Sequence, residues 1–205
     1  MANEIIVKYF DIKEYNIDML MPFKQKISLR YEKCSRYLNE KTKLQSLLAG
    51  LLIYQNMGDI ESKVKYNKYG KPYLDEDKNY FNISHTGDYV VFVKDEKNIG
   101  IDIERIREKN LNIIKHAFND KEIELIHGSA EILTKLWTIK ESVYKASGAE
   151  NYLDFKNIDT SNEIEVVYNG DKYNVISKKV DECYLSIASI NKYDNIILKK
   201  ETLQQ

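Results

Sequence analysis

Asn98-Ile-Gly-Ile-Asp-Ile-Glu104 alternates isoleucine with small or acidic residues. Because residues two apart on a strand share a face, the isoleucines predict one buried face, and Gly100, Asp102 and Glu104 lie on the other. The two carboxylates would be roughly 6.6 Å apart, at a rise of about 3.3 Å per residue. Like charges at this distance repel, and burial adds a desolvation cost, so the strand predicts a cation beside them. A hard divalent cation suits two carboxylates.

Alternating helix and strand patterns surround this strand. Before it, the sequence predicts a strand at Glu4–Phe10, a helical region at Phe23–Met57 that breaks near Asn39, and strands at Val64–Tyr66, Tyr80–Ser84 and Tyr89–Lys94. After it, the sequence predicts helices at Leu111–Phe118 and Ala130–Ser147, a helix start at Asn119, and strands at Ile164–Tyr168, Tyr173–Lys178, Cys183–Ile190 and Asn195–Lys199. This order predicts an α+β fold of two similar halves, 1–105 and 106–205, each with helices on a mainly antiparallel sheet.

The composition predicts a cytoplasmic globular protein. Hydrophobic residues make up 43% and charged residues 31% of the 205 residues, and the formal net charge is −1. Such a balance gives no overall field that would attract nucleic acid or a membrane surface. The sequence lacks an apolar run of about 20 residues and a signal-peptide start. Cys34 and Cys183 have no CxxC spacing, so two buried thiols are expected.

A second candidate stretch is the predicted helix Thr134–Ser147. Trp137, Glu141 and Lys145 are four residues apart and line one face, with adjacent members about 6 Å apart. An exposed Glu–Lys pair worth roughly 0.3–0.5 kcal/mol is the simpler interpretation of this helix alone. Combined with the acidic strand, however, the helix gives three carboxylates and one lysine, a set that suits Mg²⁺ and a phosphate group.

A third stretch supplies basic and hydroxyl groups. Lys71 follows a glycine turn that leaves it free to reach a phosphate, and Ser84-His85 stands at a predicted strand end, where the histidine can donate to an anion. A solvated loop lysine and a structural histidine remain the alternatives for these residues taken singly.

Taken together, these stretches resemble the Sfp-type 4'-phosphopantetheinyl transferases. The marks of that family stand here, in order, as Gly70-Lys-Pro72, Asn82-Ile-Ser-His-Thr86, Gly100-Ile-Asp-Ile-Glu104 and Trp137-Thr-Ile-Lys-Glu-Ser-Val-Tyr-Lys145. The matching region covers most of residues 30–148. The resemblance implies two similar α/β halves in a pseudo-two-fold arrangement, with coenzyme A in the cleft between them.

The resemblance also implies an activity of the holo-[acyl-carrier-protein] synthase type. The 4'-phosphopantetheine arm of coenzyme A would pass to a serine of an apo acyl, peptidyl or polyketide carrier protein, releasing adenosine 3',5'-bisphosphate. Asp102, Glu104 and Glu141 would hold Mg²⁺, and Lys145 would contact the phosphate under attack. The remaining coenzyme A contacts implied are Lys33, Ser46, Lys71, Ser84 and His85. Gln45 departs from the arginine common in relatives.

Several alternatives remain open on the sequence alone. The serine proton could pass to Glu141 directly or through a metal-bound water. A non-catalytic coenzyme A or carrier-binding module of the same fold is the alternative function, and a Mg²⁺-dependent nuclease or phosphatase is a third, although the neutral charge disfavours nucleic acid. The carrier surface is expected around Leu111–His127, where the apolar residues suit a core equally well. A monomer is expected, because one chain can form the whole cleft.

Overall fold

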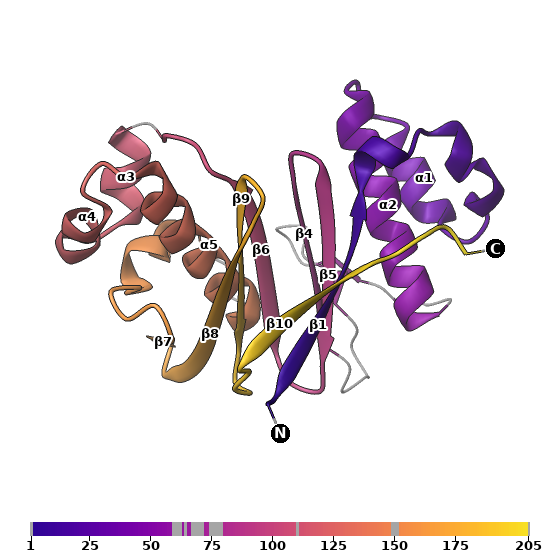
Figure 1. Cartoon of the computed structure of the whole chain (residues 1–205). Helices are drawn as coiled ribbons and strands as arrows, with labels where there is room; N and C mark the ends of the chain where they lie inside the picture. The colour runs from indigo at the N-terminus through magenta and orange to yellow at the C-terminus, as the bar shows by residue number, and fades with distance from the viewer. Residues whose placement is uncertain are drawn as a thin grey trace.

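The computed structural model, drawn in Figure 1, describes residues 2–58, 63, 65–66, 72–73, 80–109, 111–148 and 152–204. The helices are α1 (Ser28–Cys34), α2 (Glu40–Met57), α3 (Leu111–Ala117), α4 (Asp120–Ile126) and α5 (Ala130–Ser147). Three-residue-per-turn helices cover Ile12–Glu14, Asp18–Phe23 and Tyr152–Asn157. The strands are β1 (Glu4–Asp11), β2 (Lys65–Tyr66), β3 (Pro72–Tyr73), β4 (Tyr80–Thr86), β5 (Tyr89–Asp95), β6 (Ile99–Arg105), β7 (Glu165–Tyr168), β8 (Asp171–Val180), β9 (Cys183–Ser189) and β10 (Asn195–Lys200).

The strands form two four-stranded sheets and one short ribbon. The first sheet has the order β10-β1-β5-β4, the second has the order β6-β9-β8-β7, and β2 pairs with β3. Within the two large sheets, all pairs are antiparallel except β1 with β10. The α+β class predicted from the sequence is therefore confirmed.

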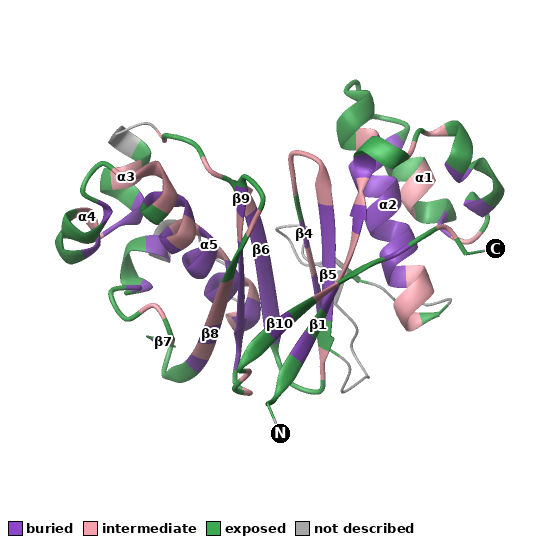
Figure 2. Cartoon of the chain, viewed as in Figure 1, coloured by how far each residue is buried: buried purple, intermediate pink, exposed green. Residues whose placement is uncertain are grey.

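The molecule is layered as helix, sheet, sheet and helix (Figure 1). Apolar side chains from both sheets meet in a common cluster, to which the first sheet contributes Val7 and Val91, and the second contributes Ile101, Ile103 and Leu185. The isoleucine face of β6 therefore points at the first sheet, and its opposite face lies beneath α5, which packs on β6 and β9. Figure 2 shows the burial that results along β5, β6 and the inner side of α5.

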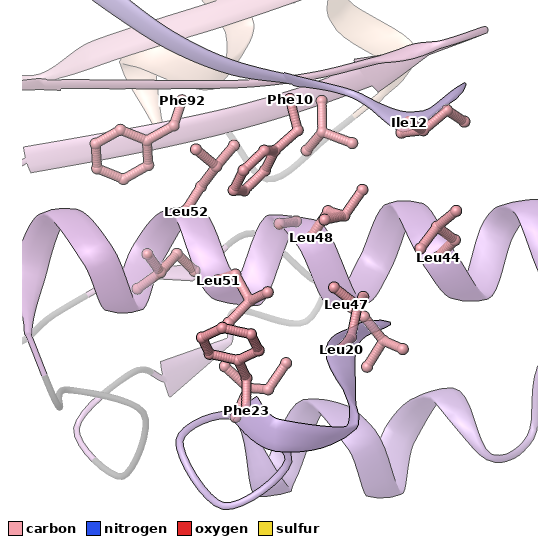
Figure 3. Close-up of a cluster of buried hydrophobic side chains, with 14 of the residues drawn as sticks. Phe10, Ile12, Leu20, Phe23, Leu44, Leu47, Leu48, Leu51, Leu52 and Phe92 are labelled. Carbon is pink, nitrogen blue, oxygen red and sulfur yellow. The ribbon is translucent and has the colours of Figure 1, made fainter. Parts of the chain in front are cut away.

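Helix α2 is buried on more than one side. Residues Leu44 to Ile53 are all buried, a continuous run that no single sheet could cover. Figure 3 shows the reason: Phe10 and Phe92 lie on one side of the helix, and Leu20 and Phe23 lie on the other. The helix predicted after the break near Asn39 is confirmed.

Asparagine and glycine residues mark the ends of several helices and strands in the structure. Asn39 caps α2 by accepting from Thr42 N at 3.0 Å, and Asn119 forms a capping box with Glu122 at the start of α4. Asn169 and Gly170 both have positive φ, 53° and 85°, as a two-residue hairpin turn between β7 and β8 requires.

The two sheets do not divide the chain at residue 105. Strand β6, which ends at Arg105, belongs to the second sheet, and β10 returns from the far end of the chain to pair with β1. The sheet membership therefore differs from the expected halves 1–105 and 106–205. The physical reason is that a hairpin pattern identifies a strand but not its neighbour, and β6 pairs with β9 rather than with β5.

The sheets are joined along β4 and β6 by side chains of the Asn82–Thr86 stretch. Ile101 N donates to Asn82 Oδ1 at 3.0 Å, Ile103 N to Ser84 Oγ at 3.4 Å, and Arg105 N to Thr86 Oγ1 at 3.4 Å. Each donor lies 19 residues after its acceptor, so the two strands run in the same direction. We call this row of three side-chain hydrogen bonds the seam.

Asp95 ties together the two places where the chain passes between the sheets. Its carboxylate, at the last residue of β5, accepts from Ser189 Oγ at 3.0 Å, Asn191 Nδ2 at 3.0 Å and Tyr193 Oη at 2.6 Å, all around the β9–β10 connection. Within the described residues, no helix combines the length and the apolarity needed to cross a membrane.

Candidate active site

The site begins with the close approach of β6 to α5 at Gly100. A Cβ atom on Gly100 would lie 2.0 Å from the Ser142 carbonyl oxygen and 2.5 Å from Ala146 N. Only a glycine therefore allows the strand and the helix backbones to come this close. The approach brings Asp102, two residues further along the strand, under the Lys145 turn of the helix.

Asp102 is buried and held by two groups. Its Oδ1 accepts from the Lys145 ammonium group at 2.7 Å and from the Ser84 hydroxyl at 2.8 Å. Lys145 also donates to the Ile101 carbonyl oxygen at 3.2 Å. The Oδ2 atom of Asp102 is buried without a hydrogen-bond partner among the described residues. A buried carboxylate oxygen in that condition is unfavourable unless something occupies its lone pairs.

Glu104 lies further out on the same face of β6, with about a quarter of its side chain exposed. It accepts from the Thr86 hydroxyl at 3.3 Å, and the Arg107 guanidinium lies 3.9 Å away. Burial, followed by the charge of Asp102, raises the pKa of Glu104 above its ordinary value. The two acids therefore repel each other through space, as their spacing on the strand predicts.

Glu141 completes an acidic cluster with these two residues. Burial raises the pKa of Glu141 to about 7, Lys145 opposes the shift, and Asp102 and Glu104 add to it. The structure thus brings together all four residues expected from the acidic strand and the Trp137–Lys145 helix. We call Asp102, Glu104 and Glu141 the carboxylate cluster.

Basic side chains lie at one end of the carboxylate cluster, near the end of β4. His85 keeps an exposed edge, yet its pKa is lowered, first by desolvation and then by the nearby charge of Lys145, with a smaller effect from Arg30. Arg30 on α1 lies against α2, where its Cγ is 3.2 Å from the position of a Cβ on Gly50. Arg30 was not singled out in the sequence, because nothing local connects it to His85.

Ser84, for which the resemblance implies a coenzyme A contact, has its hydroxyl engaged with other groups of the site. Its side chain is buried, donates to Asp102 and accepts from Ile103 N in the seam. A hydroxyl so engaged orients the Asp102 carboxylate. The sequence does not reveal this, because β4 and β6 are not hydrogen-bonded as neighbouring strands of one sheet.

The other predicted nucleotide contacts are only partly described. Lys33 is exposed on α1, and Ser46 is buried on α2. Gln45, the departure noted in the sequence, donates through Nε2 to the Gly87 carbonyl oxygen at 3.1 Å and so supports the turn after His85. Lys71 lies outside the described residues.

Lys109 is a cation that sequence reasoning missed. Its ammonium group lies 4.0 Å from the centre of the Trp137 ring, a cation–π contact. Burial lowers the pKa of Lys109, and the charges of Glu104, Asp102 and Glu141 oppose this shift. Lys109 follows Glu104 closely in the sequence, but the residues between them include other basic and acidic side chains. The sequence alone therefore did not distinguish Lys109 from its neighbours.

Lys140, the neighbour of Glu141, points away from the carboxylate cluster into the core. Its ammonium group and Glu122 Oε1 form an ion pair of 2.7 Å in which both side chains are fully buried. Lys140 also donates to the Phe155 carbonyl oxygen at 3.1 Å, and Glu122 accepts from Thr160 and Asn119. Lys140 therefore fixes α4 and the Tyr152–Asn157 helix to α5, which carries Glu141.

The carboxylate cluster fits a hard divalent cation in its chemistry. It supplies only oxygen donors, and the unpartnered Asp102 Oδ2 offers one ligand position. Among the described residues, no group of three His, Cys, Asp or Glu side chains is already arranged around a metal position. Asp102 Oδ1 is instead paired with the Lys145 ammonium group at 2.7 Å.

Fold and site together define an α+β protein whose site combines acids of strand β6 with an acid and a lysine of helix α5. A family model described as the 4'-phosphopantetheinyl transferase superfamily matches residues 98–185, which include the whole carboxylate cluster. The chain is 35% identical over 150 residues to the 4'-phosphopantetheinyl transferase gsp of Aneurinibacillus migulanus, covering 67% of this chain and 63% of that protein.

A second relative is covered over more of its own length. The chain is 31% identical over 159 residues to the 4'-phosphopantetheinyl transferase Sfp of Bacillus subtilis strain 168, covering 67% of this chain and 70% of that protein. A human L-aminoadipate-semialdehyde dehydrogenase-phosphopantetheinyl transferase is 35% identical over 99 residues, 38% of this chain and 32% of that one. The chain thus spans about two thirds of the two bacterial relatives, and it belongs to the 4'-phosphopantetheinyl transferase superfamily.

Proposed function

We propose that this chain transfers the 4'-phosphopantetheine arm of coenzyme A to a serine hydroxyl of an apo carrier protein. The observation that carries the proposal is the Asp102–Lys145 ion pair of 2.7 Å beside Glu104 and Glu141, with Asp102 Oδ2 left unpartnered among the described residues. Pure binding of coenzyme A does not require three carboxylates at one end of a phosphate site. The similarity to proteins named 4'-phosphopantetheinyl transferases supports the same reaction.

Asp102, Glu104 and Glu141 would hold Mg²⁺, which neutralises charge on the coenzyme A diphosphate when bound. Ser84 would keep the Asp102 carboxylate in position. Lys145, already at the cluster, would contact the phosphate under attack. The remaining steps need positioning and charge neutralisation more than covalent help from the protein.

The carrier serine oxygen would form a new bond to the phosphorus that bears the pantetheine arm. The bond from that phosphorus to the leaving oxygen would break, releasing adenosine 3',5'-bisphosphate. Glu141 would accept the serine proton, because it is the carboxylate of the cluster that α5 carries, one turn from Lys145. General-base assistance of this kind is typically worth about 10²–10⁴-fold.

The nucleotide would lie at the His85 end of the cluster. Lys71, Lys33 and Arg30 would supply positive charge to the nucleotide phosphates, His85 would donate a hydrogen bond to them, and Ser46 would lie against them. The two similar halves would enclose coenzyme A in a pseudo-two-fold arrangement. One chain supplies both the strand and the helix of the site, so a monomer suffices, and two free buried thiols suit a reducing cytoplasm.

The carrier protein would dock on α3 and α4. Phe118 and Ile126 are buried core residues, whereas Ile113 and Leu125 are 45% and 47% exposed. The exposed pair gives an apolar contact on the helices whose buried side shares a core cluster with α5.

Intact mass spectrometry of a carrier protein tests the proposed function. Wild-type protein is incubated with coenzyme A, MgCl₂ and an apo acyl carrier protein, with a matched reaction in EDTA. The proposal expects one phosphopantetheine to be added to the carrier only when Mg²⁺ is present. Tight coenzyme A binding without any mass gain, across acyl, peptidyl and polyketide carriers, would select a binding module instead. Hydrolysis of coenzyme A without transfer would select a phosphohydrolase.

A further inference from the structure

Two ammonium groups flank Glu141 along α5. Trp137, Glu141 and Lys145 follow one another at four-residue spacing, about 6 Å apart along the helix. Lys145 pairs with Asp102 at one end, next to His85. At the other end, the Lys109 ammonium group lies over the Trp137 ring at 4.0 Å.

The two lysines differ in how their charges are used. Lys145 is within 2.7 Å of Asp102 Oδ1. Lys109 forms no ion pair or hydrogen bond with any described residue. Its close contact is with the Trp137 ring, which carries no negative charge. A half-buried ammonium group loses part of its hydration. Without a close counter-ion, no ion pair offsets the free energy of that loss. Its position is therefore suited to an anionic ligand.

The geometry identifies which part of a ligand Lys109 would meet. His85 and Arg30 lie at the Lys145 end. With the nucleotide there, the phosphate that bears the pantetheine arm would lie beside Glu141, between Lys145 and Lys109, the two cations whose charges oppose the rise in the pKa of Glu141. Trp137 is itself fixed, because its ring stacks on Phe155 at 5.5 Å, so the ammonium group rests on a rigid surface.

We propose that Lys109 binds the pantetheine-side phosphate of coenzyme A and, at the same time, offsets the negative charge of Glu104 and Glu141. This assignment rests on the proposed function for its ligand. Burial lowers the pKa of Lys109 and the three carboxylates oppose the change, in agreement with a cation placed between solvent and the cluster.

The proposal makes two affinities move in opposite directions when the charge is removed. Without the Lys109 charge, the carboxylate cluster is more negative, so a Lys109→Met variant should bind Mn²⁺ about three- to tenfold more tightly. The same variant should bind coenzyme A about tenfold more weakly in the presence of Mg²⁺, because a charged contact to phosphate is lost. General damage to the site would weaken both.

The ligand series separates the two phosphate positions. Adenosine 3',5'-bisphosphate lacks the pantetheine-side phosphate, so Lys109→Met should bind it as the wild type does. Lys109→Arg keeps a cation that stacks on tryptophan and should stay within about threefold of the wild type for coenzyme A. Lys115→Met, an exposed lysine on α3, removes the same charge away from the cluster and should change none of the affinities.

Isothermal titration calorimetry with Mn²⁺ alone, with coenzyme A and with adenosine 3',5'-bisphosphate tests the proposal. The expected result is tighter Mn²⁺ binding, weaker coenzyme A binding and unchanged bisphosphate binding for Lys109→Met. Unchanged coenzyme A binding, or an equal loss for both nucleotides, would overturn it. These measurements need no carrier protein, so a wild type that modifies no carrier would refute the proposed function while leaving the Lys109 result decisive.

Discussion

Gly100 and Ser142 are so close that a single methyl group cannot be added between them. A Cβ on Gly100 would lie 2.0 Å from the Ser142 carbonyl oxygen. Because that oxygen belongs to the helix backbone, no side-chain rotation can relieve the clash. This contact sets the distance between the strand that carries Asp102 and the helix that carries Lys145. The ion pair between those two side chains depends on it.

We therefore predict that Gly100→Ala destabilises the protein by about 3 kcal/mol or more, through overpacking of two backbones. Urea unfolding followed by circular dichroism measures the change. Gly87→Ala is the matched control: Gly87 has a φ of 50° but no atom within 4 Å of its Cβ position, so only the conformational cost of about 1–2 kcal/mol applies. Equal losses for the two variants would contradict the close-approach argument.

We predict that removing a hydrogen-bond acceptor of the seam lowers the free energy of unfolding more at its buried end than at its exposed end. Asn82→Ala leaves the buried Ile101 N–H without its acceptor and should cost about 1–3 kcal/mol. Thr86→Val removes the acceptor of the exposed Arg105 N–H, which water can replace, and should cost less than about 1 kcal/mol. Thermal unfolding of both variants compares them, and a larger loss for Thr86→Val would show that the seam does not join the sheets as described.

We predict that removing Lys140 from its ion pair with Glu122 destabilises the protein, and that a second substitution at Glu122 restores part of the stability. Lys140→Met leaves the fully buried Glu122 charge uncompensated, so a loss of about 3–5 kcal/mol is expected. Adding Glu122→Gln removes that charge and should restore at least half of the stability in a double-mutant cycle by urea unfolding. An additive double variant would mean that the two side chains contribute independently.

Much of the fold was predictable from local signals. The alternation in residues 98–104 predicted the strand and its faces, and Asn39 and Asn119 marked element ends that the structure confirms. The pairing of β10 with β1 was not predictable, because strand alternation contains no information about a partner near the opposite end of the chain.

The site was predictable to the extent that its residues lie on single elements. Spacing on one strand and one helix brought out Asp102, Glu104, Glu141 and Lys145. The contacts of Arg30, Lys109 and Ser84 depend on how α1, the segment after β6 and the seam are packed, which a single sequence does not specify. For the same reason the ion pair of Lys145 with Asp102 was not foreseen: the sequence predicted a divalent cation beside the two strand acids, and it did not predict that Lys145 would pair with one of them.

The central claim is that the carboxylate cluster performs phosphopantetheine transfer, and single-turnover transfer by Glu141→Gln and Asp102→Asn tests it most directly. Each variant is mixed with saturating Mg²⁺, coenzyme A and apo carrier, and holo carrier is quantified by intact mass against the wild type, with melting temperature checked in parallel. We predict a loss of at least about 10²-fold in each variant, with the fold intact. Near-wild-type transfer by either folded variant would contradict the assignment.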